Sequence, residues 1–263
     1  MSLKTKWTGL KEIISFDNRL ALIAAKLFFP RERLQVYRQN GIEFLSDHDG
    51  GDGNGAREIL TSPMYRDLLR DLKFNGPINI LDLGANNGGF PLLLKSISLE
   101  IGKVVSVELN PKTWVRLHFN LHRNLDCDIK ALNAAVCGKN ERLRASLGDG
   151  TVSDNIYSGT TASNSSAVEI PGTTFDRLFE EHFADGIVDI CKIDIEGAEF
   201  EVFLSDDNKK IRNCRFVIME IHEREGHEPE ELIDAFNNLN FERQKTKPDA
   251  DPTVHLFINK SLV

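Results

Sequence analysis

The chain has 263 residues, 41% of them hydrophobic and 27% charged, which is typical of a soluble globular protein with one large α/β domain. Its formal net charge of −8 argues against a nucleic-acid binder, which needs clustered lysine and arginine to neutralise phosphate. Four cysteines without a C-x-x-C pair, no evident signal peptide and no apolar run long enough to cross a bilayer favour a cytoplasmic protein without a transmembrane segment.

Residues 1–55 predict an N-terminal helical extension that ends in a loop. Apolar residues recur at helical spacing within residues 8–40, until Pro30 interrupts the pattern. Residues 46–55 contain four glycines and three aspartates, a composition that favours a mobile connection or a lid.

This extension is basic although the whole chain is acidic. Residues 1–40 hold eight basic and three acidic side chains, a net charge of +5. A basic amphipathic helix can rest on an anionic membrane, so peripheral membrane contact is one interpretation. We favour the other, in which the apolar side chains pack on the rest of the chain and the lysines are solvated. Those apolar side chains are Leu10, Ile13, Leu20, Ile23 and Leu27.

From residue 56 to residue 263, helical stretches alternate with short apolar runs, which predicts a single domain. A helix interrupted near Pro63 is expected within residues 56–72, and further helices at about 89–99, 114–125 and 229–239. Strands are expected at residues 78–83, 103–109, 129–136, 188–195, 216–221 and 254–259, the third being followed by polar sequence to about residue 168. This alternation predicts an α/β fold with a mostly parallel, twisted sheet and helices on both faces.

A glycine-rich turn follows the first of these strands. It reads Asp82-x-Gly84-x-x-x-Gly88-Gly89, where glycine permits a tight reversal and a close approach of the chain to a ligand. The spacing differs from the G-x-G-x-x-G pattern of dinucleotide-binding turns. The second strand ends at Glu108, whose carboxylate can accept hydrogen bonds from both hydroxyls of a ribose. Together these features favour S-adenosylmethionine (SAM) over NAD as the ligand.

Ionisable side chains gather where the fourth and fifth strands end: Lys192, Asp194, Glu196, Glu220 and His222. Strand alternation places Lys192, Asp194 and Glu196 on one face of the fourth strand. It likewise places Glu220 and His222 on one face of the fifth strand. We interpret Asp194 and His222 as candidate bases, with Glu196 and Glu220 orienting the acceptor or the base, and Lys192 as an ion-pair partner. The same oxygens could hold Mg²⁺, but histidine is a poor ligand for that cation, so we expect no metal.

Four segments resemble the FkbM-type family of SAM-dependent methyltransferases: ILDLGANNGGF (80–90), VVSVELNP (104–111), ALNAAV (131–136) and KIDIEGAEFEVF (192–203). The likeness runs from about residue 78 to residue 263. It implies a Rossmann-like class I methyltransferase fold, SAM as the methyl donor, and an oxygen acceptor on a sugar, polyketide or related small metabolite or glycan.

The resemblance also implies roles around the donor. The methionine end of SAM would be lined by Asp82, Gly84, Asn86 and Gly88. The ribose would be held by Glu108, and the adenine would lie beside Asn110, Ala134 and Ala135. Residues 148–169 do not align with the family, so the resemblance leaves the acceptor open.

Two other functions remain as alternatives. An NAD(P)-dependent oxidoreductase would share the strand order and Glu108, but no Tyr-x-x-x-Lys set is visible. A non-catalytic SAM-binding scaffold would share the donor site, although it would not need the cluster of acids. The sequence does not indicate an oligomeric state.

Overall fold

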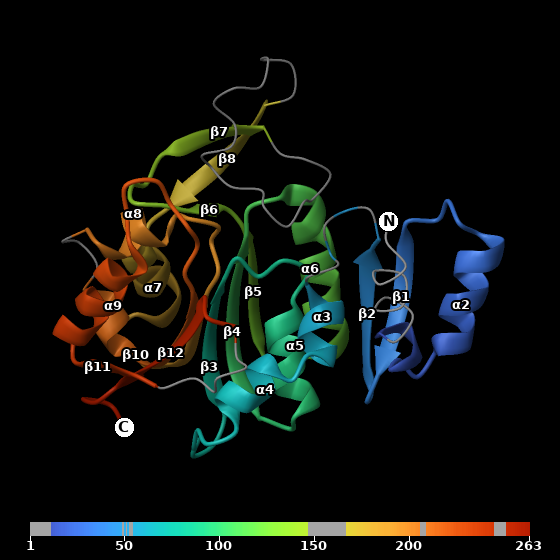
Figure 1. The fold of residues 1–263 in the computed structure, drawn as a ribbon, viewed down its shortest axis with the longest axis horizontal. Helices are drawn as coiled ribbons and strands as arrows, with labels where there is room; N and C mark the ends of the chain where they lie inside the picture. The colour runs from blue at the N-terminus through green and yellow to red at the C-terminus, as the bar shows by residue number, and fades with distance from the viewer. Residues whose placement is uncertain are drawn as a thin grey trace.

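The computed structural model describes residues 12–48, 50, 52, 55–146, 167–205, 209–244 and 251–263. Figure 1 shows a central sheet with helices on both faces and, outside one of these helix layers, a β-hairpin with a further helix. Within the described ranges, no helix combines the length and the apolar character needed to span a bilayer.

The central sheet has seven strands in the order β11-β12-β10-β9-β3-β4-β5. Their bounds are Ile78–Leu83 (β3), Ile101–Glu108 (β4), Asp128–Asn133 (β5), Val188–Ile193 (β9), Cys214–Glu220 (β10), Phe241–Arg243 (β11) and Val254–Asn259 (β12). The strands from β10 to β5 run parallel, and β12 is antiparallel to both of its neighbours. The chain moves outward from β3 through β4 and β5 and returns to β9 on the other side of β3. The expected, mostly parallel sheet is confirmed, and the carboxyl ends of β3 and β9 meet at a topological switch point.

Each central strand serves two apolar cores, one on each face of the sheet. Ile80 of β3 lies in one core and its neighbour Leu81 in the other, as expected for side chains that alternate across a strand. The first core is covered by α3 (Ala56–Thr61), α4 (Met64–Leu69), α5 (Gly89–Ser96) and α6 (Pro111–Asn124). The second is covered by α7 (Phe175–Phe183), α8 (Glu199–Phe203) and α9 (Pro229–Asn238). Burial on both faces is the reason why these strands read as continuous apolar runs.

The N-terminal extension is helical only in part, so the prediction of a helix through residue 40 is wrong. One helix, α2, covers Arg19–Phe28, but β1 (Leu34–Gln39) and β2 (Ile42–Asp47) form an antiparallel hairpin. The turn between them is Asn40-Gly41, with φ of 50° and 79°, the left-handed conformation that a two-residue hairpin turn requires. Tyr37 and Phe44 stack across the hairpin with ring centroids 5.4 Å apart.

The apolar side chains expected to pack on the rest of the chain do so only in part. Ile13 is buried and Ile23 is half-buried against the first core, whereas Leu20 and Leu27 are exposed. Leu10 lies outside the described residues. The boundary expected between residues 55 and 56 stays a prediction.

Helix α6 holds the hairpin through side chains four residues apart. The side-chain amide of Asn120 accepts from Leu45 N and donates to Leu45 O, at 2.7 and 3.0 Å. Asn124 does the same for the backbone of Glu43, at 2.8 and 2.7 Å. Arg116 forms two 2.6 Å hydrogen bonds to Asp52, which is fully buried within the loop expected at residues 46–55. The amides act as a substitute for a neighbouring strand along β2.

Part of the fold was not expected from the sequence. The apolar run at residues 129–136 divides into β5 and the short β6 (Ala135–Val136). β6 pairs with β8 (Ala167–Thr173), and β8 pairs with β7 (Arg142–Ser146). These strands form a second, three-stranded sheet, which was not expected in the polar sequence after the third predicted strand. The helix α7 was also not predicted. Its N-cap is Thr174, whose side chain accepts from Arg177 N.

Candidate functional site

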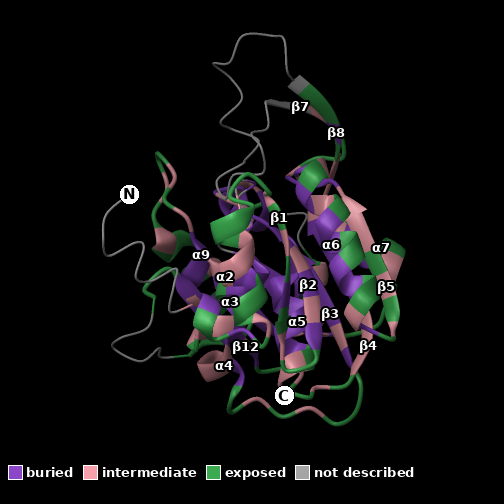
Figure 2. Ribbon diagram, turned by 90° about the vertical axis from the view of Figure 1, so that its right-hand side faces the viewer, coloured by how far each residue is buried: buried purple, intermediate pink, exposed green. Residues whose placement is uncertain are grey.

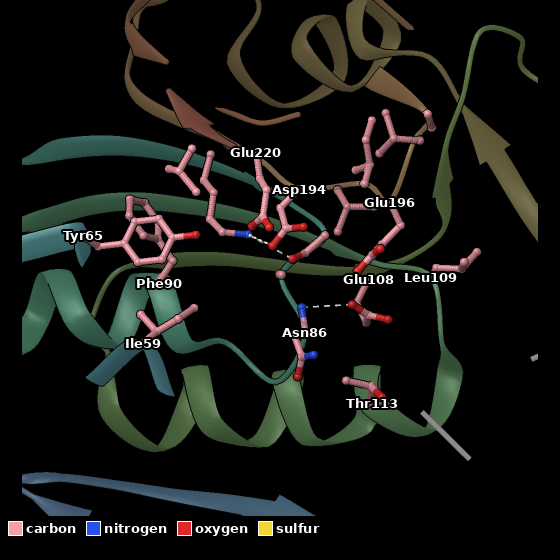
Figure 3. Close-up of a pocket in the computed structure, with 18 of the residues that line it drawn as sticks. Ile59, Tyr65, Asn86, Phe90, Glu108, Leu109, Thr113, Asp194, Glu196 and Glu220 are labelled. Atoms are coloured by element: carbon pink, nitrogen blue, oxygen red, sulfur yellow. Dashed lines mark hydrogen bonds and ion pairs between the residues drawn. The ribbon is translucent and has the colours of Figure 1, made fainter. Parts of the chain in front are cut away.

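A cavity of about 230 Å³ opens above the carboxyl ends of the central strands. Side chains that follow β3, β4, β9 and β10 line it from one side, and α3 and α4 line it from the other (Figure 3). Of the residues expected at a donor site, the lining includes Gly84, Asn86, Glu108, Ala134 and Ala135. It does not include Asp82, Gly88 or Asn110.

The turn after β3 lies directly against the end of β9. A Cβ atom on Gly84 would lie 1.6 Å from the carbonyl oxygen of Asp194, and the φ of Gly84 is +73°. Only glycine fits both the conformation and the contact. Asn86 is also left-handed, with a φ of 47°. This close approach brings the turn and the candidate base into one cavity.

Glu108 is fixed at the edge of the cavity by two backbone amides. Its carboxylate accepts from Asn86 N at 2.9 Å and from Asn110 N at 2.7 Å. A carboxylate at this edge of the cavity is suited to accept hydrogen bonds from the hydroxyls of a ribose. Asn110 itself is buried and caps α6 through Lys112 N, which is why it does not reach the cavity.

Asp82 lies beneath the cavity, fully buried in β3. Neither of its carboxylate oxygens has a hydrogen-bond partner among the described residues. The ammonium of Lys192 lies 3.8 Å from Asp82 Oδ1. Burial raises the pKa of Asp82 to about 6, against the opposing effect of the Lys192 charge. Asp82 therefore lies behind the lining of the cavity, and its expected role at the methionine end of the donor stays a prediction.

Lys192 joins the donor turn to the end of β9. Its ammonium donates to Asp194 Oδ2 at 2.9 Å and to the carbonyl oxygen of Gly84 at 3.3 Å. Burial acts to lower the pKa of Lys192, but the nearby carboxylates of Asp194 and Asp82 outweigh burial and raise it. Lys192 is therefore charged, and the expected ion pair is confirmed.

His222 is surrounded by carboxylates. Its Nδ1 is 2.9 Å from Glu199 Oε1, and its Nε2 faces Glu196 Oε2 at 3.5 Å, Asp194 Oδ1 at 3.8 Å and Glu220 Oε1 at 3.8 Å. Burial alone would lower the pKa of His222, but the hydrogen bond that it donates to Glu199 and the nearby negative charges raise the pKa to about 9. The imidazole is therefore protonated near neutral pH, which makes His222 a poor proton acceptor.

The carboxyl groups of Glu196 and Glu220, which surround His222, also have shifted pKa values. Burial, offset by His222 and reinforced by Asp194, raises the pKa of Glu196 to about 7. Burial and Asp194 also raise the pKa of Glu220. Ligand atoms of Asp194, Glu220 and His222 all lie within 4.8 Å of one another, a spacing that a cation could bridge. Two positive groups, Lys192 and His222, already stand among these carboxylates.

Two residues of the site were missed from the sequence. Tyr65 of α4 is buried, and its hydroxyl points into the cavity toward the side of Asp194 and Glu220 (Figure 3). No described residue hydrogen-bonds that hydroxyl. Glu199 is fully buried and turns back to accept from Ile195 N and to hold His222. A tyrosine on a short amphipathic helix carries no signal that separates it from a core residue.

The fold is a Rossmann-like α/β domain, and the cavity lies where such domains bind nucleoside cofactors. The residues present suit SAM, because the lining is rich in acids, which would attract a positively charged sulfur, and includes the Glu108 carboxylate, which could accept from the hydroxyls of a ribose. A family model described as "Methyltransferase FkbM domain" matches residues 82–243, more than half of the chain. The chain therefore belongs to the FkbM methyltransferase family.

Solved structures with some likeness include three methyltransferases. The methyltransferase FkbM from Methylobacillus flagellatus KT is 17% identical, with a TM-score of 0.44 over 72% of this chain and 45% of that chain. The precorrin-6y C5,15-methyltransferase from Geobacter metallireducens GS-15 is 11% identical, with a TM-score of 0.43 over 78% and 90%. The tRNA (uracil-54, C5)-methyltransferase from Pyrococcus abyssi, solved with S-adenosyl-L-homocysteine, is 10% identical, with a TM-score of 0.44 over 86% and 44%.

The chain thus spans less than half of the length of the first and third of these proteins. At TM-scores this low, the likenesses carry no weight for function. No curated protein matches the chain significantly.

Proposed function

We propose that the protein transfers the methyl group of SAM to a hydroxyl of a small metabolite or glycan, such as a sugar or a polyketide. The observation that carries this proposal is the contact between Gly84 and Asp194, because it puts the donor turn and a carboxylate base in one cavity. The acceptor class and the cytoplasmic location stay predictions.

Residues of this chain would hold the donor as follows. Glu108 would accept from the ribose hydroxyls, and Ala134 and Ala135 would pack on the adenine. Gly84 and Asn86 would let the backbone approach the methionine part. When bound, SAM supplies a methyl group on a positively charged sulfur, which an oxygen nucleophile can attack.

At the acceptor end, Asp194 is the base that we propose. It would take the proton of the acceptor hydroxyl as the oxygen attacks the methyl group, and Lys192 would hold its carboxylate in place. Protonated His222 would fix the positions of Asp194, Glu196 and Glu220 instead of acting as a base. Glu196 and Glu220 would orient the acceptor together with the unpartnered hydroxyl of Tyr65. Because Lys192 and His222 supply positive charge, the proposal needs no metal.

The proposal is tested first by binding and then by transfer. Calorimetry should show that SAM and S-adenosylhomocysteine bind one site, and that NAD and NADP do not bind. Purified protein with methyl-labelled SAM and a panel of sugars and polyketide alcohols should then yield a labelled product that resists alkali, as a methyl ether does. Binding of NAD in place of SAM would support the oxidoreductase. Tight SAM binding with no transfer to any hydroxyl, carboxyl or amine would support the scaffold.

A further inference from the structure

Helix α2 presents an apolar surface that nothing in the described structure covers. It buries Leu22 against the first core but leaves Leu20, Leu27 and Phe28 exposed by 78%, 70% and 74%, and Phe29, which follows the helix, by 59%. We call Leu20, Leu27, Phe28 and Phe29 the α2 patch. Single exposed apolar residues are ordinary, but a group of large ones on one element marks a binding surface.

The patch is concentrated on the outside of the molecule. Seven of the twelve large apolar side chains exposed among the described residues fall between residues 14 and 36. Figure 1 shows α2 on the far side of the hairpin from the central sheet, and Figure 2 shows this side facing the viewer. A partner could therefore reach the patch without displacing any element of the methyltransferase domain.

Positive charge borders the patch. Arg19 begins α2, Lys26 lies in its last turn, and Arg31 follows it; none of the three forms an ion pair with a residue that the structure describes. By contrast, Arg33 and Arg38 pair with acids of the hairpin. Residues 1–40 carry +5, so the remaining chain carries −13, and an anionic surface is attracted by the first part of the chain more than by the rest.

The charge decides between two kinds of partner. A two-fold contact between copies of the chain would bring the same cations against each other, which is unfavourable at an interface. A bilayer with acidic lipids offers both an apolar layer and negative headgroups. We propose that the α2 patch docks the protein peripherally on an anionic membrane surface, with the leucines and phenylalanines at the acyl boundary and the three cations at the phosphates.

The helix is held firmly enough to act as a docking element. Just before α2, Asn18 donates to Val36 O at 2.8 Å and accepts from Arg38 N at 3.0 Å, so the start of the helix is fixed to β1. The hairpin is in turn fixed to α6 through Asn120 and Asn124. Docking through α2 would therefore hold the whole domain in one orientation on the surface. This inference does not depend on the methyl acceptor or on the identity of the base.

Vesicle sedimentation with the full chain tests the proposal. The protein should pellet with vesicles of phosphatidylcholine and phosphatidylglycerol in equal amounts, weakly with phosphatidylcholine alone, and less as salt is raised. The variant Arg19→Gln/Lys26→Gln/Arg31→Gln should bind acidic vesicles about a hundredfold more weakly, since each cation near such a surface contributes roughly fivefold. Leu27→Ser/Phe28→Ser should also lose binding.

A matched control uses apolar side chains with comparable exposure on α6. Val115 and Phe119 are exposed by 59% and 48%, and Val115→Ser/Phe119→Ser should pellet like the wild type. Unchanged binding of S-adenosylhomocysteine would show that each variant is folded. Equal pelleting with both kinds of vesicle, or equal loss in the α6 control, would overturn the proposal. So would a wild type that ignores vesicles but runs as a dimer that Leu27→Ser/Phe28→Ser dissociates.

Discussion

Glu199 and His222 form the contact on which the charge of the acceptor site depends. Glu199 is fully buried at the start of α8, and its 2.9 Å contact with His222 Nδ1 leaves the other ring nitrogen facing three carboxylates. A protonated imidazole in this place lowers the repulsion among those carboxylates. His222 thus acts on the chemistry through the acids around it.

The raised pKa of His222 makes a prediction about stability. Because the folded-state pKa is about 9 against an ordinary 6.5, the stabilisation from His222 is fully present below pH 6.5 and is lost as the pH rises through 9. We expect His222→Gln to cost about 2 kcal/mol more at about pH 6 than at about pH 10. Urea unfolding of both proteins at the two pH values measures this, and a pH-independent difference would mean that His222 is not charged in the folded protein.

Asp194→Asn keeps the shape of the side chain but removes its basicity. We expect kcat to fall about 100-fold while the affinity for S-adenosylhomocysteine changes little. Glu196→Gln should lower kcat less, since we assign Glu196 to orientation. If instead Glu196→Gln abolishes turnover and Asp194→Asn does not, the base is Glu196, whose pKa of about 7 suits proton transfer. Loss of wild-type activity on chelation, restored by Mg²⁺, would show that the acids hold a cation.

Glu108→Gln tests the donor site. An amide retains one acceptor atom for the backbone but loses the charge that strengthens hydrogen bonds to the ribose. We expect calorimetry to show that S-adenosylhomocysteine binds more weakly by about 1–3 kcal/mol. Glu242→Gln, which removes an exposed acid on β11, is the matched control and should bind as the wild type does. Unchanged affinity in Glu108→Gln would mean that another residue holds the ribose.

At the scale of elements, the buried strands were predictable and the hairpin was not. The runs at residues 78–83 and 254–259 coincide with β3 and β12 at both ends, because strands buried on both faces are apolar without interruption. In the hairpin, Leu34 and Val36 are exposed and only Tyr37 of β1 is buried, so its alternation is weak beside the helical pattern before it. The sequence feature that could have predicted the hairpin is Asn40-Gly41, a dipeptide typical of two-residue hairpin turns.

The attachment of the hairpin makes a prediction at this scale. Asn120 is fully buried, and Asn120→Leu would leave the backbone N–H of Leu45 and the carbonyl of Asn87 without the partner that Asn120 provides. We expect the free energy of unfolding to fall by about 2–4 kcal/mol in urea titrations. Asn237→Leu, on the exposed side of α9, should change it by less than about 0.5 kcal/mol. Equal small effects would show that α6 does not hold the hairpin through this amide.

For the molecule as a whole, the sequence patterns predicted the position of the site better than they predicted the contacts within it. Strand alternation placed Asp194, Glu196 and Glu220 at one edge of the sheet because that placement depends only on local geometry. The pairing of His222 with Glu199 and the entry of Tyr65 into the cavity depend on how α8 and α4 pack, which involves contacts between distant segments. The α2 patch could not be predicted either, since a helical pattern does not show which of its apolar side chains pack against the rest of the molecule.

The contact between the donor turn and the end of β9 also bears on the order in which ligands bind. Lys192 donates both to the Gly84 carbonyl and to Asp194, so one ammonium group contacts both the turn after β3 and the end of β9. A ligand that moves the turn would act on Asp194 through this ammonium group, and we expect it to change the affinity for the second ligand. Such coupling is reciprocal. The factor by which bound S-adenosylhomocysteine changes the affinity for the acceptor must therefore equal the factor by which bound acceptor changes the affinity for S-adenosylhomocysteine. We therefore expect the close contact at Gly84 to link the binding of the two ligands.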